Sequence, residues 1–124
     1  REGVLRRGAA FVALRADGSV LLRTRPPKGL LGGMAEVPTS EWSAEYDVAK
    51  AVLDAPLEAR WRRLPAPVRH VFTHFPLELS VLVAKVARET PAPEGGRWVV
   101  QEALGAEPLP NLMKKVVAAA LAPG

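Results

Sequence analysis

One short segment carries two imidazoles and a hydroxyl among aromatic rings, in the order His70-Val-Phe-Thr-His-Phe75. Imidazole and hydroxyl groups donate or accept hydrogen bonds, and a neighbouring aromatic ring offers an apolar surface. Two histidines in a segment without a carboxylate make a poor metal site. The pattern therefore indicates either a polar recognition turn or an ordinary turn in which Phe72 belongs to the core and the histidines carry no chemistry.

Basic residues gather in two parts of the chain. Seven lie in residues 1–30 with two acids, four arginines lie in residues 60–69 with none, and the acids concentrate in residues 36–58. Such segregation can steer a polyanion to one face, although a solvated surface also explains it. Five candidates for phosphate contacts follow, two in an exposed Gly/Pro loop and three flanking the turn: Arg25, Lys28, Arg62, Arg63 and Arg69.

The apolar pattern predicts mostly strands around these residues, at 6–14, 20–24, 35–37, 68–72, 77–86 and 97–101. Asp17-Gly18 supplies a hairpin turn, because both residues can take a positive φ. Helices are expected at 43–53, capped by Ser43, and at 111–121, with Lys114 and Lys115 on its solvent face. The fold class is α+β (mixed α/β), a mixed sheet flanked by helices.

Composition narrows the classes of protein that the chain can belong to. Its 124 residues, 48% of them hydrophobic, suffice for one domain spanning 1–124. The absence of cysteine excludes disulfides, thiol catalysis and a cysteine-held metal cluster, and it fits a cytoplasmic location. No apolar run approaches the roughly 18 residues of a membrane span. Because the chain opens on Arg1 and not Met, we expect it to be a piece of a longer protein.

Three stretches in this order resemble the C-terminal domain of MutY-type adenine DNA glycosylases: Arg25-Pro-Pro-Lys-Gly-Leu-Leu-Gly-Gly-Met34, His70-Val-Phe-Thr-His-Phe75 and Leu109-Pro-Asn-Leu-Met-Lys-Lys115. The resemblance covers nearly the whole chain. It implies a Nudix-like fold and a non-catalytic role in base excision repair. The domain would help to find 8-oxoguanine paired with adenine, while an N-terminal domain removes the adenine.

The resemblance also implies roles for the turn, which in the family approaches the oxidised guanine. Phe72 would lie near that base or its neighbour, Thr73 would make the polar contact, and His74 would meet backbone or phosphate. The chain departs from the family pattern at four positions: Ala35, Val37, Thr73 and Pro76.

Two partners follow from the resemblance, namely double-stranded DNA with 8-oxoguanine opposite adenine, and the N-terminal catalytic domain of the same protein. No cofactor is expected in this chain, whereas the family carries a four-iron–four-sulfur cluster in its N-terminal domain. Since a tether makes a weak second contact effective, we expect the domain alone to bind DNA weakly.

A Nudix hydrolase, an adenine-excising glycosylase and a protein-interaction module are the alternative function classes for this sequence. A Nudix hydrolase binds metal through a helix reading Arg-Glu-x-x-Glu-Glu, and magnesium needs such clustered carboxylates. Aligned on Glu36, that pattern matches only at Glu58, and no Glu-Glu pair occurs in the chain. Adenine excision is not expected either, since no helix-hairpin-helix signal is present. A protein-interaction module is a third possibility, using the acidic span 36–58 and the Pro-rich loop 90–96.

Overall fold

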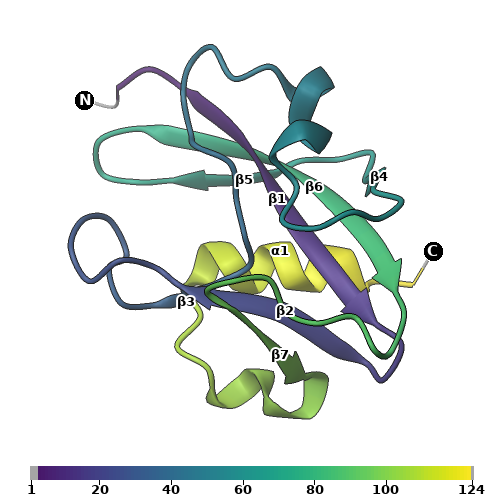
Figure 1. Ribbon diagram of the computed structural model, residues 1–124. Helices are drawn as coiled ribbons and strands as arrows, with labels where there is room; N and C mark the ends of the chain where they lie inside the picture. The colour runs from purple at the N-terminus through teal and green to yellow at the C-terminus, as the bar shows by residue number, and fades with distance from the viewer. Residues whose placement is uncertain (1–2, 124) are drawn as a thin grey trace.

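Two long parallel strands, β1 (Arg6–Arg15) and β6 (Pro76–Val86), form the centre of the sheet in the computed structural model, which describes residues 3–123 (Figure 1). Their register runs from Arg6 opposite Leu77 to Arg15 opposite Val86. Most residues of both strands are buried on both faces, as parallel strands covered by helices require. The prediction of a mixed sheet is confirmed.

The remaining strands extend this centre on both sides. On one side β2 (Ser19–Thr24) runs antiparallel to β1 and also pairs with β7 (Gly96–Val100) and β3 (Ala35–Glu36). On the other side β5 (Val68–Val71) and β4 (Arg62–Arg63) both run antiparallel to β6. They are therefore successive pieces of one sheet edge.

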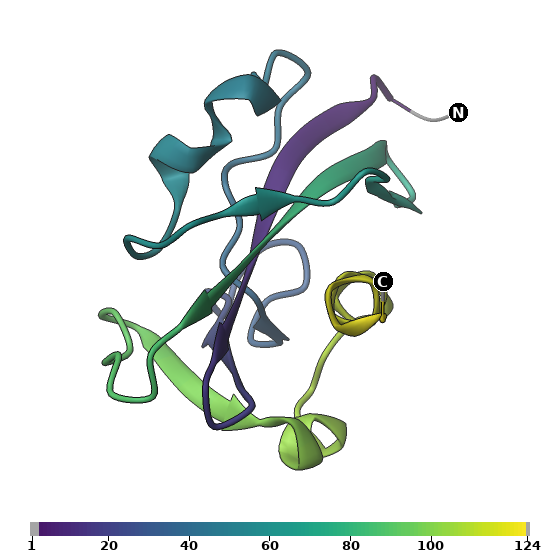
Figure 2. The ribbon, with the colours of Figure 1, turned by 90° about the vertical axis from the view of Figure 1, so that its right-hand side faces the viewer.

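Helical segments cover the two faces of the sheet, as Figure 2 shows. The helix α1 (Asn111–Leu121), which has the predicted bounds, packs Leu112, Met113 and Val116 into the main core. The short 3-10 helix η1 (Val48–Asp54) lies over the other face, where a smaller core forms around Phe11. A second 3-10 helix, η2 (Gln101–Ala106), precedes α1 and was not predicted.

The helix expected over residues 43–53 is wrong in its first half. Ser43 does not cap a helix but forms a β-bridge with Arg7, with two backbone hydrogen bonds of 2.9 Å. Asp47 is the cap, since its carboxylate accepts from the amide of Ala49 at 3.1 Å. The strand-like pairing of residue 43 with β1 outweighs the local helical spacing of the sequence.

The hairpin between β1 and β2 differs in detail from the expectation. Gly18 has a φ of +89°, whereas Asp17 does not take a positive φ. The Asp17 carboxylate instead accepts from the amide of Ser19 at 3.1 Å and pairs with Arg15 at 2.7 Å. These two contacts, with the positive φ of Gly18 alone, suffice to close the turn.

Candidate functional site

The Phe-Thr-His segment forms the tight turn between β5 and β6. The amide of Phe72 donates to the carbonyl of Phe75 at 2.9 Å, and the amide of Gly3 donates to the carbonyl of His74 at 2.8 Å. A side chain at Gly3 would not fit, because its Cβ would lie 2.5 Å from that carbonyl oxygen. Backbone bonds thus hold the turn from two sides, while Thr73 and His74 are exposed.

An aromatic cluster supports the turn from below. The half-buried ring of Phe72 lies 4.7 Å from the His70 ring, 5.2 Å from the Phe75 ring and 6.1 Å from the Trp42 ring, between centroids. The Trp42 and Phe72 planes are inclined by only 18°. Such separations suit favourable aromatic pairs. Phe72 therefore supports the turn and packs on the core, as one of the two expectations stated for it required.

The expectation that Arg25 lies exposed in a loop is wrong. Its Nη1 pairs with Oε1 of Glu36 at 2.8 Å, and its Nε donates to the carbonyl of Leu30 at 2.9 Å. The guanidinium carbon lies 5.0 Å from the centroid of the Trp42 ring. Glu36 is almost fully buried, with 2% of its side chain exposed. Arg25 is therefore only partly exposed and is held against Glu36, because a buried carboxylate needs a cation beside it.

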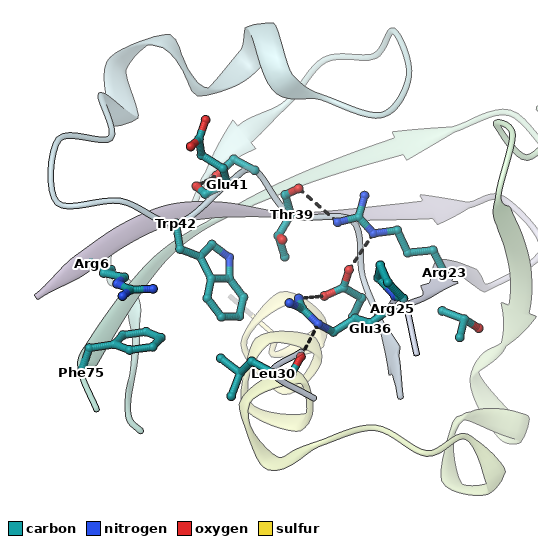
Figure 3. A pocket seen from close by; sticks show the side chains of 12 residues that line it. Arg6, Arg23, Arg25, Leu30, Glu36, Thr39, Glu41, Trp42 and Phe75 are labelled. Atoms are coloured by element: carbon teal, nitrogen blue, oxygen red, sulfur yellow. Dashed lines mark hydrogen bonds and ion pairs between the residues drawn. The ribbon is translucent and has the colours of Figure 1, made fainter. Parts of the chain in front are cut away.

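A cavity of about 640 Å³ opens beside the turn, and Figure 3 shows its walls. Phe75 and Arg6 form one side, Trp42 lies in the middle, and Arg25 with Glu36 forms the other side. The guanidinium carbon of Arg6 lies 4.0 Å from the centroid of the Phe75 ring, so cation and ring attract each other. The turn and cavity together offer aromatic, cationic and hydrogen-bonding groups in one place.

The other predicted cations lie at different distances from the turn. Arg69 flanks it as expected, since it stands opposite Glu78 near the start of β6 and pairs with that carboxylate at 2.9 Å. Arg62 and Arg63 do not flank it. They stand opposite Val83 and Leu82, which at about 3.3 Å per residue is about 20 Å along β6 from the turn. Lys28 is exposed in the loop after β2.

Lys115 is a neighbour of the turn that sequence reasoning placed only on a solvent face. Its Nζ donates to the carbonyl of Arg69 at 3.2 Å and lies 3.2 Å from Nδ1 of His70. Burial, and then the charge of Lys115, lower the pKa of His70 below its ordinary value of 6.5. No spacing in the sequence signals this contact, because it joins α1 to a strand far away in the chain.

Within residues 3–123, no group of three or more His, Cys, Asp or Glu side chains is placed to hold a metal ion. The stretch where a Nudix box would lie forms a short 3-10 helix instead of a long α-helix, and Asp54 there accepts from the Tyr46 hydroxyl at 2.8 Å. Among the described residues 3–123, no helix has the length and apolarity that crossing a membrane requires.

Comparisons with known proteins agree with this architecture. Residues 9–119 match the family model of the NUDIX domain. The chain is 35% identical over 107 residues to the human adenine DNA glycosylase, which covers 78% of this chain. It spans only 20% of that relative's length. The C-terminal domain of mouse MUTYH, solved in complex with human PCNA, matches with 30% identity and a TM-score of 0.72, over 90% of this chain and 84% of that one.

More distant structures share the fold alone. A MutT protein from Methanosarcina mazei has a TM-score of 0.66 at 16% identity, over 98% of this chain and 99% of that one. The Ap4A hydrolase of C. elegans has a TM-score of 0.65 at 16% identity, over 95% and 99%. Fold similarity at this level says nothing about activity, so the site must carry any functional inference.

Proposed function

Because this chain belongs to the NUDIX domain family, in the branch of the MutY-type glycosylase C-terminal domains, we propose that it recognises 8-oxoguanine opposite adenine in double-stranded DNA. The family relationship supports a role in DNA repair. The adenine would be excised by a catalytic domain elsewhere in a longer protein. The repair would take place at the chromosome in the cytoplasm. A hydrolase role for this chain is not favoured, because the carboxylates of a Nudix box are lacking.

The proposal rests above all on the exposed side chains of Thr73 and His74, which project from a turn held by backbone bonds on two sides. A fixed turn presents polar groups in one geometry and so loses little entropy on binding. Phe72, at the first position of the turn, packs in the aromatic cluster and would lie near the oxidised base or its neighbour.

The chemistry of the lesion suits such a turn. Oxidation converts N7 of guanine from an acceptor to an N–H donor and adds an oxygen at C8. An acceptor aimed at N7 is satisfied by the lesion and faces a lone pair in normal guanine, a difference of roughly 1–3 kcal/mol for a well-placed contact. The hydroxyl of Thr73 can accept this bond, but it can also donate to N7 of normal guanine, so this atom alone discriminates weakly. A backbone carbonyl only accepts and would discriminate better, and the carbonyl of His74 keeps a second lone pair beside its bond from Gly3. We assign the polar contact to Thr73, whose side chain is exposed at the turn.

Phosphate contacts would orient the duplex around the turn without reading its sequence. Arg69 and Lys28 are exposed candidates, and Arg62 and Arg63 would meet the DNA backbone farther from the lesion. We leave Arg25 out of this set, because Glu36 and a backbone carbonyl hold its guanidinium. A tether to the catalytic domain would let these individually weak contacts act together.

A titration of this chain with matched duplexes tests the proposal. One duplex carries 8-oxoguanine opposite adenine and the other carries guanine opposite adenine, at low and moderate salt. We expect weak binding to both and tighter binding to the lesion. Equal affinity for the two duplexes would remove lesion recognition from this chain.

A further inference from the structure

Two arginines form an ion cluster with one buried carboxylate beside the turn, and each arginine starts a separate branch of contacts. Glu36 accepts from Arg23 through Oε2 at 2.7 Å and from Arg25 through Oε1 at 2.8 Å. The Arg23 branch ends at the carbonyl of Thr39, 3.2 Å from Nη2. The Arg25 branch continues to the ring of Trp42 (Figure 3). Only one of the two arginines therefore contacts the aromatic cluster.

The Arg25 branch leads on to the recognition turn. Trp42 lies nearly parallel to Phe72, and Phe72 is the first residue of the turn. Arg25 also bonds the carbonyl of Leu30, which fixes the Gly/Pro loop on the opposite side of the same guanidinium. One side chain thus touches the buried anchor, the loop and the aromatic cluster that supports the turn.

We propose that Arg25 is a positioning residue for the Phe-Thr-His turn, with Glu36 as its buried anchor and Trp42 as the link to Phe72. A planar guanidinium suits this role, because it forms hydrogen bonds in its plane and presents its face to an aromatic ring. The inference rests on the proposed function of the turn. It gives a role to a cation that the sequence had assigned to DNA.

The two arginines provide a matched pair of variants. Arg25→Gln and Arg23→Gln each remove one guanidinium from Glu36 and leave the other in place, but only Arg25→Gln frees Trp42. Two readouts are measured on both variants. The first is the NMR signals of the Phe72 and His74 rings in the free protein, and the second is affinity for the lesion and undamaged duplexes across a salt series.

We expect Arg25→Gln to shift the ring signals of the turn and to reduce the lesion preference by about threefold to tenfold, the scale of one aromatic contact. The dependence of log affinity on log salt should stay unchanged, because no phosphate contact is lost. Arg23→Gln should leave the ring signals and the preference as they are.

Several results would overturn the inference. A salt slope that falls by about 1 with unmoved ring signals would make Arg25 a phosphate contact. Equal shifts in both variants would mean that the ion cluster acts through general packing. If the unaltered chain shows no lesion preference, the proposed function fails, and the ring signals alone then decide the positioning role. If Arg25→Gln does not fold, Arg25→Lys keeps a charge beside Glu36 but lacks the planar guanidinium that faces Trp42, and it must shift the same signals.

Discussion

Arginines from other segments lie near both ends of β6, and they make different contacts. At its first residues, the cations beside the turn are engaged, Arg25 by a buried carboxylate and Arg6 by an aromatic ring. At its far end, Arg62 and Arg63 are exposed and have no ion pair with any other described residue. The difference teaches that a basic residue near a recognition turn can be part of the scaffold, and that free cations can lie elsewhere.

The largest expected effect is a difference in the free energy of unfolding between changes at the two ends of β6. Glu36→Ala leaves the partly exposed guanidinium groups of Arg25 and Arg23 without their carboxylate, and losing hydrogen bonds to a charged group should cost about 1.5–3 kcal/mol in the free energy of unfolding. Arg62→Ala with Arg63→Ala should stay within about 0.5 kcal/mol, as exposed surface changes do. Urea unfolding of both variants checks this. Equal losses would contradict the division between held and free cations.

A somewhat smaller effect is expected for the anchor of the turn. Phe72→Ala removes a half-buried ring from the aromatic cluster and should lower the free energy of unfolding by about 1–3 kcal/mol. The neighbouring Val71 is 69% exposed, so Val71→Ala is the matched control, with an effect within about 0.5 kcal/mol. Thermal or urea unfolding measures both. If the two variants lose the same stability, Phe72 is not an anchor.

The arginines at the far end of β6 should contribute to the salt dependence of DNA binding, whereas Arg25 should not. Arg62→Ala with Arg63→Ala is expected to reduce the salt slope of DNA binding by about 2, since each lost phosphate contact contributes about 0.9. The lesion preference should not change, because both residues lie about 20 Å from the turn. An affinity series in increasing salt tests both statements, and an unchanged slope would remove these arginines from the DNA surface.

The smallest expected effect is a pH dependence at the turn end. The folded protein lowers the pKa of His70, so the unfolded chain takes up the proton first. The stability that neutral His70 provides is complete above its ordinary pKa of 6.5 and is lost as the pH falls below that value. Urea unfolding from pH 8 to 5, set against His70→Gln, should show this loss only with histidine present. In Lys115→Met, NMR should find the pKa of His70 higher than in the unaltered chain.

The sequence predicted those elements whose apolar residues are buried in the core. The apolar residues of β1, β6 and α1 recur at the spacing of a strand or a helix, and the structure buries them. The strand β4 was missed, because the pair Arg62-Arg63 looks like a solvated loop and pairs only through its backbone. The helix at 43–53 failed because Ser43 bonds to Arg7, a partner that local spacing does not reveal.

The site was predicted only in part for the same reason. Family motifs pointed to the turn at residues 72–74, but the residues that support it come from distant parts of the chain. Trp42 lies against Phe72, and Glu36 is linked to Trp42 through Arg25. No spacing between residues 25, 36, 42 and 72 could have shown that a cation in a Gly/Pro loop belongs to the scaffold.

The central claim is that the hydroxyl at residue 73 reads the lesion, and a pair of substitutions tests it most directly. Thr73→Val removes the hydroxyl and keeps the shape, whereas Thr73→Ser keeps the hydroxyl and removes a methyl. The affinity ratio between duplexes with 8-oxoguanine and with guanine opposite adenine is measured for both variants and for the unaltered chain. We predict that the serine variant keeps the preference and that the valine variant shows a smaller one. Full preference in Thr73→Val would contradict the account.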